Sequence, residues 1–158
     1  MEDGRFARPV LPKIFVPSFV DNGVTGSTNH QYRRGGLTKM QYLLLIYGNE
    51  SQFDQMSPTE QNKILLEYGE FSKSIAGSGH MRGGNELDRI SKAKTVRVRQ
   101  GKRSVLDGPF AETKEQLGGY YLVEAKDVEE ALALAARIPS ARWGSIEIRP
   151  IIPHEMPS

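Results

Sequence analysis

The stretch LDGPFAETKEQLGGYYLVEA, residues 106–125, joins a sharp turn to a strongly apolar segment. Gly108 can adopt a positive φ, and the ring of Pro109 fixes the next φ at about −65°. Two glycines then lead into GYYLVEA, residues 119–125, which carries apolar side chains at consecutive positions. A strand of this kind is apolar on both faces and predicts burial on both.

The segment QYLLLIYG, residues 41–48, has the same character, with six apolar or aromatic residues in a row. It predicts a second strand whose two faces are both covered. GSIEIRPI, residues 144–151, instead alternates apolar and charged residues and predicts a strand with one buried face.

Two segments carry helix signals. SPTE, residues 57–60, combines a capping serine, a proline at the first helical position and a glutamate that completes a capping box. The apolar stripe that follows comprises Ile64, Leu65, Tyr68, Phe71 and Ile75. In DVEEALALAARIP, residues 127–139, Asp127 is the expected cap and Pro139 the expected stop. Its apolar face comprises Ala131, Leu134, Ala135 and Ile138.

Three segments connect these elements. KTVRVRQGKRSVLD, residues 94–107, predicts a β-hairpin with Gly101 in the turn. TKEQ, residues 113–116, matches a small capping box and predicts a single helical turn. GSGHMRGG, residues 77–84, follows a helix and has arginine where a dinucleotide loop needs its third glycine, so we expect a flexible connection.

The order of elements is that of a split β-α-β unit with an additional hairpin, an α+β fold. Two helices cover only one face of a sheet, whereas two of the strands are apolar on both faces. A second copy of the same sheet is the simplest cover for the other face. The sequence therefore predicts a homodimer whose sheets pack face to face.

The terminal regions differ from this central part. Residues 1–39 are rich in Pro, Gly, Ser and Thr, and three readings fit them: a disordered arm, an upstream extension that precedes a true start at Met40, or a docking arm. We place the folded domain at residues 40–152, followed by a short tail at 153–158.

The composition excludes several classes of function. The chain has no cysteine, which excludes disulfides, thiolate zinc sites and a cysteine nucleophile. No cluster has convincing metal spacing and no cofactor motif is present, so neither a metal nor a cofactor is predicted. No apolar run is long enough to span a membrane, and the expected location is cytoplasmic.

The motifs DGPFAETKE, LGGYYLVEA, AARIPSA and GSIEIRPI together resemble the YCII-related family, in the branch named for its DGPF motif. The resemblance runs from Met40 to about Ile152. It implies a ferredoxin-like subunit of a dimeric α+β barrel, in agreement with the elements above. Some relatives resemble small-molecule lyase-type enzymes. Many members of the DGPF branch are encoded beside extracytoplasmic-function sigma factors, which implies a regulatory link.

Asp107 is the candidate catalytic residue. As a turn residue it would hold its own backbone; as an acid or base it would lie partly buried at the mouth of a pocket beside Phe110. In the wider family a proposed His–Asp pair takes its histidine from the first helix, where this chain has Glu67 and Tyr68. His80 is the substitute candidate; otherwise it is a histidine of a surface loop.

We expect the ligand-binding residues to surround the same turn: Gly108, Pro109, Phe110, Tyr121, Arg97 and Arg99. One of two adjacent tyrosines must face the pocket, because neighbours on a strand point in opposite directions. The two arginines belong to a basic run between residues 89 and 106 and would steer an anion. The simpler interpretation of that run is the solvated face of a hairpin with Val96 and Val98 turned inward, and nucleic-acid binding is disfavoured because no aromatics interleave it.

The leading functional hypothesis is a small-molecule-binding protein, with an enzyme that uses Asp107 as acid, base or substrate anchor as its sharpest form. The alternative is a non-catalytic protein that acts with a sigma factor or another regulator.

Overall fold

The structure is a computed structural model that describes residues 39–153. Its sheet has four antiparallel strands in the order β2-β5-β1-β6, and a separate hairpin pairs β3 with β4. The strands are β1 (Met40–Gly48), β2 (Met81–Glu86), β3 (Lys94–Arg99), β4 (Lys102–Asp107), β5 (Gln116–Ala125) and β6 (Ser145–Pro150). The helices are α1 (Glu50–Asp54), α2 (Pro58–Gly77) and α3 (Val128–Ala135), with 3₁₀ turns η1 (Ile90–Lys92) and η2 (Pro139–Arg142). This arrangement confirms the predicted α+β class and agrees with a ferredoxin-like fold.

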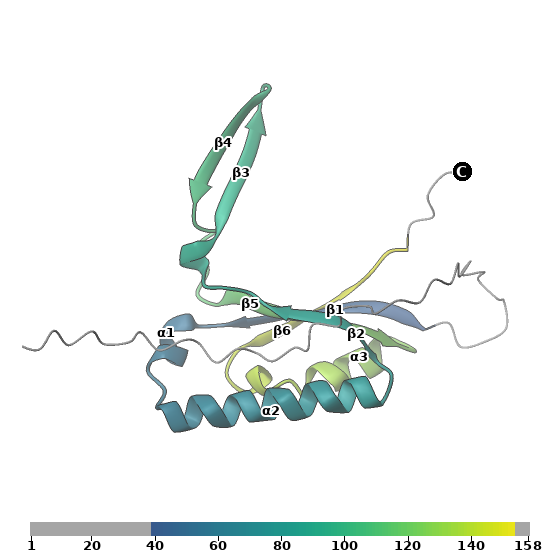
Figure 1. The fold of residues 1–158 in the computed structure, drawn as a ribbon. Coiled ribbons are helices and arrows are strands. Elements are labelled where there is room, and N and C mark those ends of the chain that lie inside the picture. The colour runs from purple at the N-terminus through teal and green to yellow at the C-terminus, as the bar shows by residue number, and fades with distance from the viewer. Residues whose placement is uncertain (1–38, 154–158) are drawn as a thin grey trace, which may run out of the picture.

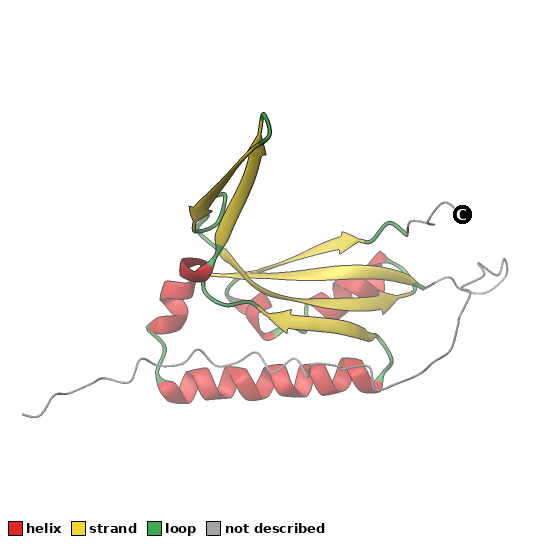
Figure 2. Ribbon diagram, turned by 45° about the horizontal axis from the view of Figure 1, so that its top comes forward, coloured by secondary structure: helices red, strands yellow, loops and turns green. Residues whose placement is uncertain are grey.

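Helices α2 and α3 pack on one face of the sheet, as Figures 1 and 2 show. The core between them is made by alternate residues of the central strands, such as Leu44 of β1 opposite Tyr121 of β5, both fully buried. The helices contribute the stripes expected from their spacing, including Phe71, Ile75 and Leu134. Tyr121 meets Ser72 of α2 through a buried 2.7 Å hydrogen bond and the Phe71 ring edge-on.

The helix starts confirm the sequence signals. Ser57 accepts the backbone N–H of Glu60, whose side chain accepts the N–H of Ser57, so the capping box is complete. Asp127 caps α3 by accepting the N–H of Glu130. These local bonds satisfy donors that a helix N-terminus leaves unpaired.

Two connections were predicted incorrectly. Residues 77–84 were expected to be a flexible connection, but 81–84 belong to strand β2, because β5 supplies the hydrogen-bonding partner along that edge of the sheet. TKEQ forms no helical turn: Gln116 already belongs to β5, and its side chain donates to the carbonyl of Thr113. The short helix α1, capped by Asn49, was not expected.

The hairpin of β3 and β4, residues 94–107, is hereafter called the arm. It turns through Gln100 and Gly101, whose positive φ values of 50° and 75° suit a two-residue hairpin loop. The arm rises from the side of the sheet opposite α2 and packs on neither the sheet nor the helices (Figure 1). The expectation that Val96 and Val98 turn inward is therefore wrong: they are 59% and 58% exposed.

The face of the sheet away from the helices is the open face. It presents Leu43, Leu45 and Tyr47 of β1 beside Tyr120 and Leu122 of β5, all half-buried. No described helix covers it (Figure 2). The face-to-face homodimer stays a prediction that this open apolar face favours.

Within residues 39–153, no helix has the length and hydrophobicity needed to cross a membrane. The three readings of the N-terminal extension concern residues that lie almost entirely outside the described part of the chain.

Candidate functional site

A small cavity of about 120 Å³, partly open to solvent, lies at one end of the sheet, beneath β1 and β5 and against α1, α2 and η2. We call it the inner cavity. Its wall is mainly apolar and includes Ile46, Phe53, Ile64, Leu65 and Trp143. Ligand sites in proteins are typically apolar hollows with a few well-placed polar groups.

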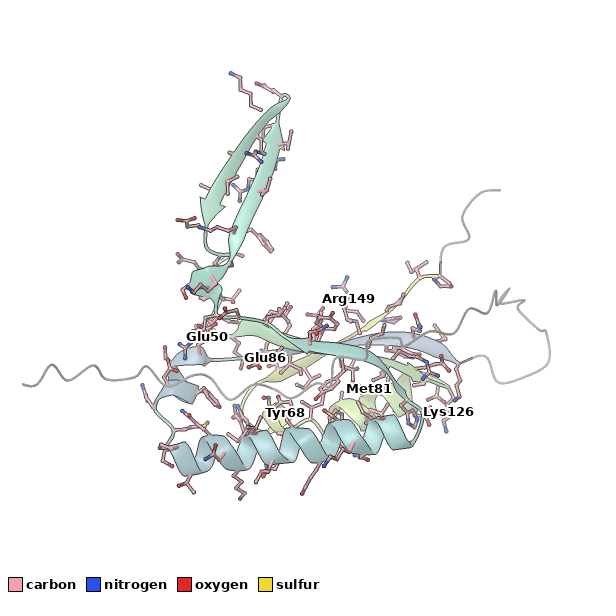
Figure 3. All side chains as sticks on the ribbon, in the orientation of Figure 1. Glu50, Tyr68, Met81, Glu86, Lys126 and Arg149 are labelled. Atoms are coloured by element: carbon pink, nitrogen blue, oxygen red, sulfur yellow. The ribbon has the colours of Figure 1, made fainter. Side chains whose placement is uncertain are left out.

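The polar groups of the inner cavity come from several elements. Tyr68 of α2 and Ser140 of η2 share a 2.5 Å hydroxyl–hydroxyl hydrogen bond. Burial raises the pKa of Tyr68 well above its ordinary value, and the nearby Glu86 adds to the increase. Tyr68 therefore stays protonated at neutral pH. In Figure 3 Tyr68 and Glu86 lie between the sheet and α2, and Glu50 lies at the end of the sheet nearest the arm.

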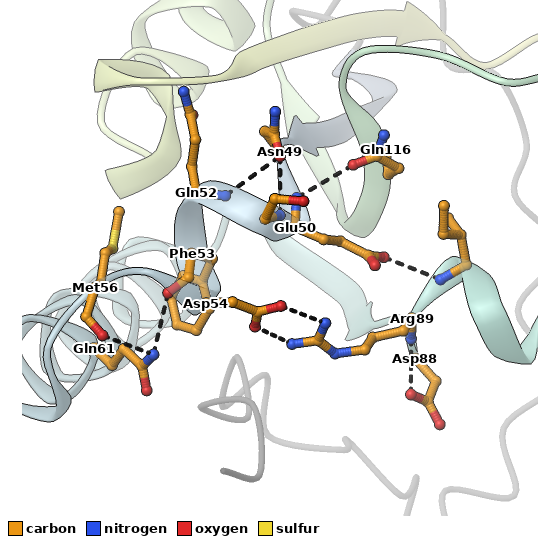
Figure 4. Close-up of polar contacts among 12 residues, drawn as sticks. Asn49, Glu50, Gln52, Phe53, Asp54, Met56, Gln61, Asp88, Arg89 and Gln116 are labelled. Carbon is orange, nitrogen blue, oxygen red and sulfur yellow. Dashed lines mark hydrogen bonds and ion pairs between the residues drawn. The ribbon is translucent and has the colours of Figure 1, made fainter. Parts of the chain in front are cut away.

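Helix α1 is fastened across this end of the sheet (Figure 4). The backbone N–H of Glu50 donates to Gln116 Oε1 at 3.2 Å, and Glu50 Oε1 accepts the N–H of Ile90 at 3.0 Å. Asp54 forms a bidentate ion pair with Arg89. The Arg89 hydrogen bond lowers the pKa of Asp54. These contacts tie α1 to the segment from which the arm rises.

A larger, open hollow of about 830 Å³ lies on the other side of the same segment. We call it the outer hollow. Leu87, Arg89 and Gln116 line both spaces, so the two are neighbours separated by these side chains. Pro109 and Phe110 of the DGPF turn form part of its wall. Both were predicted from the sequence to contact a ligand, and this stays a prediction.

The DGPF turn is held by its backbone. Gly108 has a φ of 91°, and its N–H donates to the carbonyl of Ala93 at 2.8 Å. The hydroxyl of Thr95 donates to the carbonyl of Gly108 at 2.8 Å. The glycine is required here because an L side chain strains at that φ. The turn thereby fixes the base of the arm over the outer hollow.

The structure does not bring the two candidate catalytic residues together in one chain. The Asp107 side chain is 84% exposed and pairs with Lys94 across the arm, and Phe110 beside it is 80% exposed. His80 hydrogen-bonds to Ser78 and lies 3.5 Å from Glu130. The six-residue strand β2, about 20 Å long, separates His80 from the arm.

Three other predicted ligand residues lie away from both spaces. Tyr121 points into the core, and its neighbour Tyr120 is on the open face, where it accepts a hydrogen bond from Asn85. Arg97 and Arg99 lie on the exposed arm and line neither space. An anion that binds these arginines would therefore stay outside the inner cavity.

Sequence reasoning missed most of the inner cavity's polar wall: Glu50, Glu86, Arg89, Gln116 and Ser140. They come from separate segments and share no motif. Trp143, the only tryptophan in the chain, was an available signal. Its side chain is large and apolar, so its position before a turn glycine predicts that it packs against other residues.

The charges around the inner cavity favour particular ligands. Its lining contains two carboxylates, Glu50 and Glu86, and one guanidinium, Arg89, which forms an ion pair with Asp54. The lining residues therefore include one more acidic than basic side chain. A neutral or cationic group is expected to enter more readily than an anion.

Two comparisons place this architecture among known proteins. The model of the YCII-related domain matches residues 40–155. A protein of Rhizobium meliloti (strain 1021), named "Uncharacterized protein R00369", is 35% identical over 124 residues, which cover 75% of this chain and 100% of that protein. The sigma-factor link implied by the sequence resemblance stays a prediction.

Proposed function

The chain belongs to the YCII-related family, and we propose that it is a small-molecule-binding protein whose ligand occupies the inner cavity and extends into the outer hollow. The observation that carries the proposal is the pairing of a small apolar cavity with a larger hollow through a shared wall of Leu87, Arg89 and Gln116. The ligand would place an apolar group inside and a larger polar part outside, against Pro109 and Phe110.

The size of the inner cavity sets the size of that apolar group. Its 120 Å³ is close to the roughly 150 Å³ of a protein cavity that binds benzene. A single ring or a short branched chain would fill it. The hydroxyls of Tyr68 and Ser140 and the carboxylate of Glu50 offer hydrogen bonds to a neutral or cationic substituent.

The hypothesis that Asp107 acts as an acid or base has less support, because its carboxylate is exposed on the arm. Tyr68 and Glu86 are better placed to act on a molecule inside the cavity. We therefore propose binding as the function and assign any proton transfer to the inner cavity rather than to the DGPF turn.

We propose in addition that the functional unit is a homodimer formed through the open face. Five apolar or aromatic residues of β1 and β5 are presented there without a helix above them. A contiguous apolar surface of this kind marks an interface more often than a solvated face. The outer hollow opens beside this face, since Tyr47 and Leu117 line it.

The binding proposal is tested by fluorescence titration of the full chain. Trp143 is the only tryptophan and lines the inner cavity, so its emission reports on occupancy. Three probes share an aliphatic ring that does not absorb: cyclohexylmethanol, cyclohexylmethylamine and cyclohexanecarboxylate. We expect the alcohol and the amine to change the emission saturably, and the carboxylate to bind about tenfold more weakly or not at all.

A pair of variants locates the site. Gly48 lines the inner cavity and Gly77 ends α2, and a Cβ built on either meets nothing within 4 Å. Gly48→Leu should fill the cavity and abolish the emission change, whereas Gly77→Leu should leave it intact. Binding that survives Gly48→Leu, or that prefers the carboxylate, would overturn the proposal.

A further inference from the structure

The arm has two different sides, because cross-strand partners in a hairpin point to the same side. Val96 pairs with Val105, and Val98 pairs with Arg103 on the same side two residues further along. We call the side that carries these three valines, together with Arg103 and the Lys94–Asp107 pair, the valine side. The opposite side carries Thr95, Arg97, Arg99, Lys102 and Ser104 with Leu106 near its base.

Within residues 39–153, the valine side is not covered by any other part of the chain. All three valines are at least half exposed, and no residue of the arm is buried. A two-stranded hairpin on its own is marginally stable in water. An arm with three exposed valines on one side, and a more basic opposite side that carries Arg97, Arg99 and Lys102, therefore needs an apolar surface on which to lie.

We infer that the arm lies on the body of a second copy of this chain, with its valine side inward. The body is the described part of the chain without the arm, residues 39–93 and 108–153. The inference rests on the proposed homodimer and specifies a contact that the face-to-face packing of sheets does not require. The arm rises on the same side as the open face (Figure 1). A copy seated on that face is consequently flanked by the arm.

Dimensions fit this placement. Each strand of the arm has six residues, about 20 Å at 3.3–3.4 Å per residue. Four strands spaced about 4.8 Å apart make a sheet of similar width. The arm is long enough to run along the partner's sheet, and residues at its base already line the outer hollow.

Charge favours arm-to-body contact over arm-to-arm contact. The arm has five basic residues and one acidic residue, a net charge of +4. The other described residues, 39–93 and 108–153, have 11 basic and 14 acidic residues, a net charge of −3 with histidine neutral. Two arms repel each other, whereas each arm is attracted to the body of the other copy.

The first experiment identifies what the valine side touches. The chain has no cysteine, so V98C provides one attachment point for a photoactivatable benzophenone. Equal amounts of labelled ¹⁵N and unlabelled ¹⁴N full chain are mixed, irradiated and analysed by mass spectrometry. We expect mixed-isotope cross-links from position 98 to residues of the body. Cross-links confined to one isotope, or made only between two arms, would overturn the inference.

The second experiment compares neighbouring positions on β4. Val105 belongs to the valine side and Ser104 to the opposite side, so V105E and S104E introduce the same charge on opposite surfaces. The dimer dissociation constant is measured by sedimentation equilibrium. We expect V105E to weaken association about tenfold or more and S104E to leave it within about twofold. Equal effects would contradict a valine side that faces the partner.

The outcomes separate this inference from the proposals on which it rests. A full chain that stays monomeric at every concentration removes both the homodimer and the arm contact, but leaves the Trp143 titration untouched. A dimer in which V105E has no effect removes the arm contact alone. Salt-sensitive binding of the basic side to duplex DNA, with V98C cross-links to the DNA and none to the body, would assign the arm to nucleic acid instead.

Discussion

The central strands and the arm are both regular antiparallel pairs that end in opposite environments. Val123 of β5 is fully buried, whereas Val98 of the arm is 58% exposed. Pattern and turn residues are enough to make both into strands. What differs is the surface opposite: α2 and α3 cover Val123, whereas no other part of residues 39–153 covers the valines of the arm.

The largest difference between the two regions should appear when an apolar side chain is shortened. Leu44 is fully buried at the centre of β1, so Leu44→Ala should lower the free energy of unfolding by about 2–5 kcal/mol. Val96→Ala, on the arm, should change it by less than about 0.5 kcal/mol under monomeric conditions. Urea denaturation at low protein concentration measures both. Similar losses would mean that the arm packs on its own chain.

A smaller effect is expected where the body leaves no room for a side chain. A Cβ on Gly144 would lie 2.2 Å from the carbonyl oxygen of Tyr47, at the start of β6. Gly144→Ala should therefore cost about 1–3 kcal/mol as β6 is pushed from β1. Gly77→Ala is the control, because its Cβ meets nothing and the alanine suits a helix end. If thermal unfolding showed no loss of stability for Gly144→Ala, the close approach of residue 144 to Tyr47 would be contradicted.

A pH dependence distinguishes the two adjacent tyrosines of β5. Burial raises the pKa of Tyr121 from 10.0 to about 12, so the folded state holds this proton more tightly than the unfolded state. The resulting stability is fully present below pH 10 and is lost as the pH rises towards 12. Tyr121→Phe should cost about 1 kcal/mol at neutral pH by leaving Ser72 without its partner, and should make the alkaline loss shallower.

Tyr120→Phe is the matched control for that prediction, since it removes the neighbouring hydroxyl from the open face. Stability is measured by urea denaturation at successive pH values for the parent chain and for both variants. An identical profile for both variants would show that Tyr121 contributes no linkage between protonation and folding.

The structural features that could be predicted from the sequence are those that a few adjacent residues determine. The capping box at Ser57, the cap at Asp127 and the hairpin turn at Gly101 each depend on a few adjacent residues, and all occur as expected. The two-faced strands also predicted an open apolar face. Pro109 and Phe110 line the outer hollow, and their predicted role in binding a ligand stays a prediction.

The features that the sequence did not predict depend on contacts between residues that lie far apart in the chain. MRGGNE, residues 81–86, has no apolar alternation, and it is a strand only because β5 offers an unpaired edge. Adjacent tyrosines had to point oppositely, but the packing of α2, not the sequence of β5, determines that Tyr121 is the one in the core. The wall of the inner cavity gathers residues from six separate elements, so no single segment predicted it.

The comparison between arm and body is tested most directly by hydrogen exchange of the full chain, measured by mass spectrometry below and above the dimer dissociation constant. We predict that amides of residues 95–106 exchange rapidly in the dilute sample and slow by about tenfold or more in the concentrated one. Amides of β1 and β5 should be protected in both. Arm amides that are equally protected at both concentrations, or that remain unprotected in a formed dimer, would contradict an arm that is covered by a second copy.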